Sequence, residues 1–357
     1  MKKIILYIVN FLNNLARRIY SMSLVLNLEI YEYKTIKRKY NLFYRINALL
    51  RGYSSDLYAF LKKKGYYKYS ISEFEYRYKI NNINKDYGIL FADKQLMYVY
   101  FNKYLEYFPT LYFYIENGRF PRKDFRTLLT ILKLDNKLIL KQTRSYGGKN
   151  VHLLEYIAKN YYYDGERVTS IKLKHILCKL KSNYIITEYV KQSTYASNIN
   201  RTSVNSMRIM TLYDRDTNKC WIGGVTHRFG TKNSGFVDNV TRGGLSASVN
   251  IETGYLEKAL LYEKDTREIT HHPDTNVAIT GTKIDNWELI QSKILELAKQ
   301  ATRTPYLGWD VVSTKDGFKI LEINECADIH LIQYHTPPLK DERNRAFFEK
   351  YGIKIKK

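Results

Sequence analysis

The chain has 357 residues, which is long enough to bury a sizeable core and to form two or three domains. Hydrophobic residues make up 45% of it and charged residues 26%, a balance typical of a globular protein and not of a disordered one. No stretch approaches the run of about 18 uncharged apolar residues that a transmembrane helix requires, so we expect no such helix.

The formal net charge of +23 points to an anionic partner: nucleic acid, anionic lipid or a phosphorylated substrate. The chain is rich in Lys, Ile, Asn and Tyr, as expected from AT-rich coding DNA, so part of this charge reflects base composition. No Lys/Arg-rich helix or nucleic-acid-binding motif accompanies it, and we do not expect a nucleic-acid partner. The three cysteines are widely spaced and form no metal-ligand or disulfide pattern, which fits the cytoplasm.

Residues 1–80 are predicted to be helical, because they contain few Gly or Pro residues and place Leu26, Ile30 and Tyr33 at helical spacing. The first twelve residues resemble the start of a signal peptide, but no small-residue cleavage site follows them. We interpret them as an amphipathic helix. It either packs on the body of the protein or contacts another surface, such as the inner face of a membrane or a glycosyltransferase.

The next segment, 81–136, is predicted to alternate helices with one strand. Asp93 is a candidate N-cap for a helix that carries Lys94 and runs to about Tyr107. After this helix we expect a strand at 111–115, a turn at 117–118 and a short helix near 122–133.

A glycine-rich hairpin follows. A short apolar strand ends in Lys141, the polar loop contains Gly147-Gly148-Lys149, and an apolar strand resumes at Val151. Glycines let backbone amides approach an anion closely, and lysines supply point charge to phosphate. The loop is not a Walker motif, because it lacks the Gly-Lys-Ser/Thr ending and no helix follows it. An ordinary turn is the alternative interpretation.

Strands predominate from residue 184. The first ends in Glu188-Tyr189-Val190, and the next, at 203–212, carries Arg208 within an apolar run. A buried cation needs a partner, which could be an anionic ligand or a structural carboxylate. Two glycine-rich segments follow and contain Arg228 and Arg242.

A β-hairpin is predicted at 308–325, with its turn at Asp316-Gly317. Glu322 and Asn324 share a face because strand side chains alternate, and folding the hairpin brings Asp310 opposite them. Two carboxylates and an amide oxygen suit Mg²⁺, which completes its octahedron with waters and phosphates. The alternative is a solvated hairpin with acids on its wet face. We expect an amphipathic helix at 285–303, and a basic C-terminal tail whose residues 349–357 are solvated.

The order of these elements resembles the ATP-grasp superfamily, and in detail its sugar-transfer-associated branch, which is found with polysaccharide biosynthesis genes. The resemblance covers roughly residues 87–338. It rests on two longer matches, one beginning at Asn205-Ser206-Met207-Arg208-Ile209 and the other at Gly308-Trp309-Asp310. It implies an α+β fold in which two subdomains grip ATP, with a helical N-terminal region. The implied division is N-terminal helices (1–80), a pre-ATP-grasp segment (81–136), a lid subdomain (137–190), a C-terminal subdomain with the metal site (191–340) and a tail (341–357).

The resemblance also implies roles for particular residues. We expect the oxyanion and acyl phosphate to be met by cationic side chains, and the histidines at 227, 330 and 335 to be structural. The loop at 143–148 departs from the family's small-residue pattern by including an arginine and a tyrosine. The implied roles are phosphate contacts for Lys94 and Lys141, a mobile cover for Gly147, Gly148 and Lys149, adenine pairing for Glu188, Tyr189 and Val190, Mg²⁺ ligation for Asp310, Glu322 and Asn324, and catalysis for Arg208, Arg228 and Arg242.

The implied activity is that of an ATP- and Mg²⁺-dependent carboxylate–amine ligase. Such an enzyme activates a carboxylate as an acyl phosphate, which an amine then attacks. We expect the acid to be a uronic-acid-type surface polysaccharide, such as a capsule, or its precursor, and the amine to be an amino acid or amino group. The alternatives are a kinase-like phosphoryl transfer and a non-catalytic nucleotide-binding accessory of glycan assembly. We expect a cytoplasmic location, with or without attachment to the inner face of the membrane.

Overall fold

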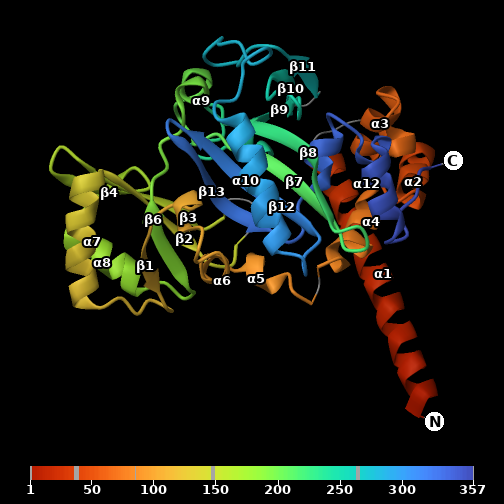
Figure 1. The fold of residues 1–357 in the computed structure, drawn as a ribbon, viewed down its shortest axis with the longest axis horizontal. Helices are drawn as coiled ribbons and strands as arrows, with labels where there is room; N and C mark the ends of the chain where they lie inside the picture. The colour runs from red at the N-terminus through yellow and green to blue at the C-terminus, as the bar shows by residue number, and fades with distance from the viewer. Residues whose placement is uncertain (1, 36–39, 85, 146–148, 263–265, 357) are drawn as a thin grey trace.

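The computed structural model describes residues 2–35, 40–84, 86–145, 149–262 and 266–356, except for the side chains of 2–8 and 35. It confirms a mixed α+β architecture with a helical N-terminal region and two antiparallel sheets (Figure 1). None of the described helices is both long and apolar enough to cross a membrane. The N-terminal helices are α1 (Lys2–Thr35), α2 (Leu42–Leu50), α3 (Ser55–Lys63) and α4 (Glu73–Tyr78).

The smaller sheet has six strands in the order β1-β6-β2-β3-β4-β5. Helices α7 (Arg122–Asp135) and α8 (Ser170–Cys178) pack on it (Figure 1). Residues 125, 128 and 132 of α7 are spaced by three and four, so they form the buried apolar side of that helix. The strands are β1 (Leu111–Ile115), β2 (Lys137–Gln142), β3 (Val151–Ile157), β4 (Asn160–Tyr163), β5 (Glu166–Val168) and β6 (Tyr184–Glu188).

The small sheet begins earlier in the chain than the predicted lid. Strand β1 comes from the segment 81–136, yet it pairs with β6, with Ile115 opposite Tyr184. The predicted helix from Asp93 is shorter than expected. It forms α6 (Lys94–Tyr100), because the chain leaves the helix at Phe101 to bury that ring against Phe108 and Trp309.

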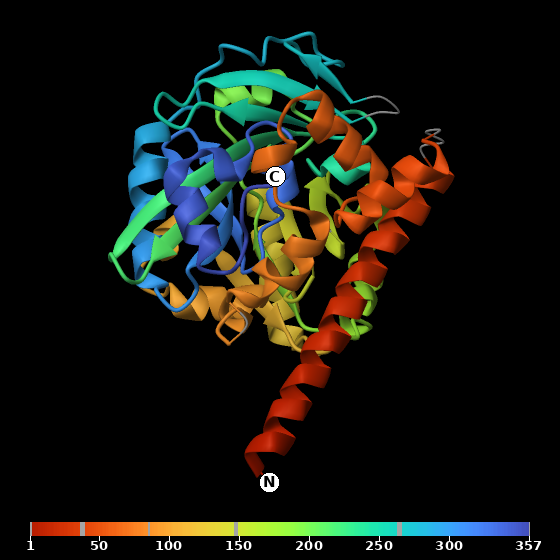
Figure 2. The ribbon, with the colours of Figure 1, turned by 90° about the vertical axis from the view of Figure 1, so that its right-hand side faces the viewer.

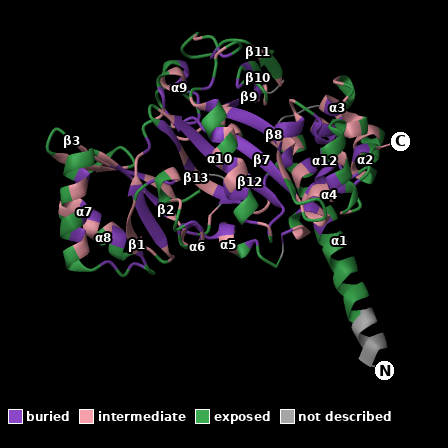
Figure 3. Ribbon diagram, viewed as in Figure 1, coloured by how far each residue is buried: buried purple, intermediate pink, exposed green. Residues whose placement is uncertain are grey.

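The larger sheet has seven strands in the order β11-β10-β9-β8-β7-β12-β13. Helix α10 (Trp287–Gln300) packs against it through residues 287, 290, 294 and 297, as the amphipathic pattern predicts. Figure 3 shows how fully its central strands are buried. The strands are β7 (Met207–Asp214), β8 (Lys219–Phe229), β9 (Leu245–Val249), β10 (Leu256–Leu261), β11 (Arg267–Ile269), β12 (Tyr306–Thr314) and β13 (Gly317–Asn324).

Short helices connect these layers. Helix α6 is N-capped by Asp93, whose side chain accepts a hydrogen bond from the backbone N–H of Gln95, as predicted. The remaining helices are α5 (Ile89–Ala92), α9 (Thr194–Ile199), α11 (Ile329–Gln333) and α12 (Glu342–Glu349).

The prediction of a solvated tail at 349–357 is only partly correct, because residues 349, 350, 352, 354 and 355 are exposed whereas Ile353 is buried. Helix α12 buries Phe347 and Phe348, and Ile353 is fully buried in the same cluster. The ammonium of Lys356 lies 2.6 Å from Glu75, and the C-terminus lies against the N-terminal helices (Figure 2). The many basic residues of the segment suggested a solvated tail. Its few apolar residues nevertheless determine where the segment packs, because burying them is favourable.

Candidate active site

A large cavity is shared by three parts of the chain. Its volume is about 1530 Å³, and its walls come from β2, β3 and β6 of the small sheet, from β7, β8, β12 and β13 of the large sheet, and from helices α1, α3 and α4. Pockets for a single small ligand commonly measure roughly 300–1,000 Å³. The cavity therefore has room for more than one substrate.

The hairpin β12–β13 forms one wall of the cavity. Asp310 lies opposite Glu322, as predicted, and Gly308 lies opposite Asn324. A β-bulge follows Asp310, so that buried Ile320 and buried Ile323 are three residues apart instead of two. The bulge allows Leu321 and Glu322 to line the cavity together, while both isoleucines stay in the core.

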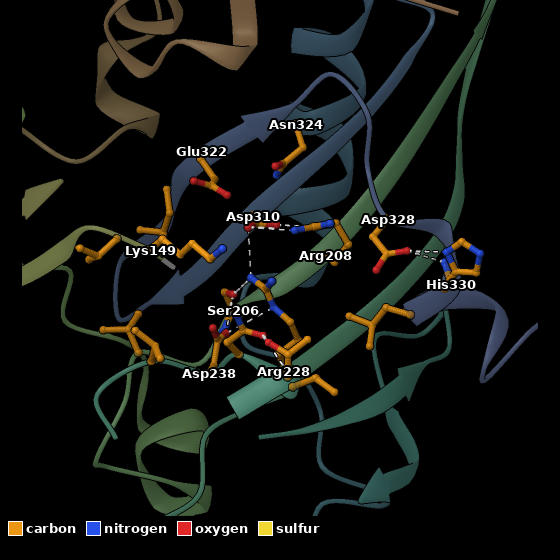
Figure 4. A pocket seen from close by; sticks show the side chains of 18 of the residues that line it. Lys149, Ser206, Arg208, Arg228, Asp238, Asp310, Glu322, Asn324, Asp328 and His330 are labelled. Atoms are coloured by element: carbon orange, nitrogen blue, oxygen red, sulfur yellow. Dashed lines mark hydrogen bonds and ion pairs between the residues drawn. The ribbon is translucent and has the colours of Figure 1, made fainter. Parts of the chain in front are cut away.

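Asp310 is held by two arginines from neighbouring strands (Figure 4). Its carboxylate accepts hydrogen bonds from Arg208 at 2.5 and 3.2 Å, and Nη2 of Arg228 lies 3.1 Å away. Burial alone would raise the pKa of Asp310, but the two guanidinium groups hold that pKa well below its usual range. The partner that the buried Arg208 required is thus a carboxylate of the protein. Arg228 also contacts Ser206 and lies 3.5 Å from Asp238.

Two buried lysines face this hairpin. Nζ of Lys94 lies 3.3 Å from Oε2 of Glu322, and Nζ of Lys141 donates to the backbone carbonyl of Leu321 at 3.0 Å. Burial, together with the nearby charge of Lys94, lowers the pKa of Lys141 to about 8. Glu322 supplies one negative charge for these two buried cations, which leaves an excess positive charge that is costly to bury. The geometry therefore favours an additional, anionic ligand at this point, as expected for phosphate.

The family is identified by comparison with known proteins. The model of the family described as "Sugar-transfer associated ATP-grasp" matches residues 73–342, which is more than half of the chain. The chain belongs to the sugar-transfer associated ATP-grasp family. The predicted membership of the ATP-grasp superfamily, and of its sugar-transfer-associated branch, is thus confirmed. No curated protein matches the chain.

Solved structures of several ligases and synthetases are similar to the chain, at low identity and with low TM-scores. D-alanyl-alanine synthetase A from Vibrio cholerae matches at 9% identity and a TM-score of 0.39, over 74% of this chain and 62% of its own. Phosphoribosylamine–glycine ligase from Thermotoga maritima matches at 12% and 0.41, over 76% and 57%. N5-carboxyaminoimidazole ribonucleotide synthetase from Thermus thermophilus matches at 11% and 0.37, over 70% and 51%. The chain thus spans between about half and three fifths of the length of these enzymes.

The part of the cavity next to Lys141, called the slot below, is lined partly by apolar side chains. Glu188, Tyr189 and Val190, the expected adenine hinge, line the cavity together with Ile139 and Leu321. The carboxylate of Glu188 accepts a hydrogen bond from Thr110 at 2.9 Å, which fixes the end of β6. A flat base suits a slot with such walls.

The glycine loop and Arg242 are the predicted site residues that the structure does not fully place in the cavity. Gly147 and Gly148 are outside the described residues, whereas Lys149 lines the cavity (Figure 4). Arg242 is exposed at the end of a 3₁₀ turn and is not among the cavity-lining residues, although Thr241 and Gly243 are. The structure therefore brings Arg208 and Arg228 together and leaves Arg242 apart from them.

The hairpin carries donors that fit Mg²⁺. In the described part of the chain, no three His, Cys, Asp or Glu side chains come close enough to hold a metal by themselves, so an amide is needed as well. Asn324 supplies it: the residue is only 9% exposed, lines the cavity, and its Nδ2 has no hydrogen-bond partner. A carboxylate has about four lone-pair sites, and the arginines use three of those on Asp310. Oxygens of Asp310, Glu322 and Asn324 could therefore hold the ion.

The histidines differ in their surroundings. His227 is buried against Phe229 and hydrogen-bonded to Tyr195, and burial lowers the pKa of His227 to about 3. It therefore stays neutral near pH 7, which suits a structural role. His330 lines the cavity, where its ring nitrogen lies 2.9 Å from Asp328.

The third wall was not predicted. Glu32 and Asp56 of the N-terminal helices line the same cavity as Asp328, although they are separated by more than 250 residues. Burial, with Glu73 and Asp56 close by, raises the pKa of Glu32 to about 8. Local sequence patterns do not indicate that residues so far apart in the chain line the same cavity. The wall also contains the aromatic residues Tyr31, Phe60, Tyr76, Tyr262 and Tyr334.

Lys141 is expected to make ATP binding depend on pH. The protonated ammonium attracts phosphate, and the free protein loses that charge as the pH rises through about 8. The affinity for ATP should therefore fall above pH 8, by up to about tenfold per pH unit. Titration calorimetry between pH 7 and 9.5 measures this, and Lys141→Arg should remove the slope because arginine stays charged. Equal slopes in both proteins would place the titrating group elsewhere.

Proposed function

We propose that this protein is an ATP- and Mg²⁺-dependent carboxylate–amine ligase that works through an acyl phosphate. One observation carries the proposal. A single cavity contains two buried lysines facing the Asp310, Glu322 and Asn324 set, with Arg208 and Arg228 beside them. Phosphoryl transfer requires cations and a metal around the phosphate oxygens, and this arrangement provides the cations together with oxygen atoms that could hold a metal.

The residues of the large sheet would orient the acid. Arg228 is only 15% exposed, borders the cavity and contacts Asp310, so its position is fixed before any ligand enters. A cation that is already in position stabilises the negative charge that develops on the oxygens of the reacting carboxyl group. The protein does not have to rearrange during the reaction to provide this stabilisation. Mg²⁺ held by the hairpin would neutralise phosphate charge.

The third wall suits the amine. Asp56 and Asp328 give it negative charge, and the Asp328 side chain is 57% exposed. Oε2 of Glu32 is buried and has no hydrogen-bond partner. Carboxylates and aromatic faces both attract an ammonium group. The cavity is thus cationic where ATP and the acid would bind, and acidic where the amine would bind.

The family's description favours a sugar-linked acid. We propose a uronic-acid-type surface polysaccharide, such as a capsule, or its precursor as the carboxylate, and an amino acid or amine as the acceptor. The reaction would take place in the cytoplasm, where ATP is available.

The test supplies purified protein with ATP, Mg²⁺ and a panel of uronic acids paired with amino acids. Release of ADP and phosphate that requires both partners supports the ligase, and mass spectrometry of the product should show loss of water between them. Release of ADP that requires only the acid, with the phosphate retained on that acid, indicates a kinase. A protein that binds no nucleotide would refute both activities. The Glu322→Gln variant is the inactive control.

A further inference from the structure

Helix α1 exposes an apolar stripe. Six side chains, spaced by three or four residues, are each between 37% and 62% exposed. At these spacings they lie on one side of the helix. The apolar stripe consists of Leu12, Leu15, Ile19, Met22, Leu26 and Ile30.

An adjoining side of α1 attaches the helix to the protein. Ser21, Val25 and Glu29 are spaced by four and are buried, and Glu29 accepts hydrogen bonds from Ser55 and pairs with Arg45 at 2.6 Å. Residues 9–20 are all exposed, and α1 projects beyond the body in two perpendicular views (Figures 1 and 2). The N-terminal part of the stripe, from Leu12 to Ile19, therefore lies on the projecting part of the helix.

The charged residues of α1 indicate which kind of surface its apolar stripe would bind. Its first acidic residue is Glu29, which is buried. Arg17 and Arg18 lie on the exposed part, where they also contact Asn82 and Tyr78, and the chain has a net charge of +23. Tyr20, 65% exposed, adds an amphipathic ring of the kind found at membrane interfaces. An apolar side, cations and no exposed acid before residue 30 are typical of helices that lie in the surface of an anionic bilayer.

We propose that the apolar stripe of α1 binds the surface of an anionic phospholipid membrane. A coiled coil of two copies is the competing occupant, because 12, 15, 19, 22 and 26 also fit a heptad pattern. Partners in such coils pair charges of both signs beside the seam. The flanking positions here include Ala16, Arg18 and Ser23, with no acid, so two copies would meet without salt bridges. The helix lies on the membrane and does not cross it.

The test is co-sedimentation of the full chain with vesicles of phosphatidylcholine containing about 30% phosphatidylglycerol, and with vesicles of phosphatidylcholine alone. We expect stronger binding to the anionic vesicles, weakened by added salt. The variant Leu15→Ser/Ile19→Ser removes apolar area from the stripe and should bind at least about tenfold more weakly. The variant Asn10→Ser/Asn13→Ser, also on the exposed part of α1, is the matched control and should bind as the wild type does.

Three results would overturn the proposal. The first is no preference for anionic vesicles, and the second is equal binding by the stripe variant and its control. The third is a dimer, measured by light scattering, that the stripe variant dissociates, since the occupant would then be a second copy. ATP-dependent turnover in solution should be the same in all these proteins, because α1 residues 10–19 lie outside the cavity. Failure of membrane binding is therefore distinguishable from failure of the ligase.

Discussion

Replacing Glu322 with glutamine is expected to lower ATP-dependent turnover by about a hundredfold to a thousandfold while leaving the fold intact. Glu322 faces the cavity, is 24% exposed and lies 3.3 Å from the ammonium of Lys94. Glutamine keeps the size of the side chain, but it removes the charge that the metal and the lysine both require. The measurements are kcat/KM at several Mg²⁺ concentrations and the free energy of unfolding.

A matched control comes from the far end of the large sheet. Glu268→Gln makes the same chemical change at a residue that pairs with Lys64 and Lys258 outside the cavity. Its activity should stay within about twofold of the wild type, because surface ion pairs contribute little. Near-normal activity in Glu322→Gln would remove that residue from the metal site.

The local elements were predictable because their signals lie within short windows of sequence. The hairpin at 308–325 follows from Asp316-Gly317 between apolar runs, and Gly317 does adopt a positive φ of 147°. Helix α10 follows from its apolar spacing. These signals work because side-chain periodicity and turn chemistry act over a few residues.

Features that depend on distant pairs could not be predicted. The sequence left the partner of Arg208 open, and only the pairing of β7 with β12 places Arg208 opposite Asp310. The meeting of Glu32 with Asp328 likewise requires the complete fold. The bulge after Asp310 does leave a trace, since Ile320 and Ile323 break the two-residue period, but that break has several interpretations before the strands are paired.

Neutralising Asp310 has a consequence that neutralising Glu322 does not have, because two arginines depend on the charge of Asp310. Arg208 is 8% exposed, and Asp310→Asn would leave this guanidinium and that of Arg228 without their shared negative charge. Breaking a buried ion pair by removing one partner typically costs about 3–5 kcal/mol. We therefore expect Asp310→Asn to lose both activity and stability, whereas Glu322→Gln loses activity alone.

The pH dependence of that stability loss tests its cause. The arginines depress the pKa of Asp310 in the folded state, so its contribution to the free energy of unfolding is complete above the unfolded pKa of about 4. The contribution is lost as the pH falls through the depressed folded value. The gap between wild type and Asp310→Asn, measured by urea unfolding, should therefore be constant from pH 7 to pH 5 and should narrow below pH 4. A gap that stays constant down to pH 2 would show that altered packing, and not the loss of the charge on Asp310, destabilises the variant.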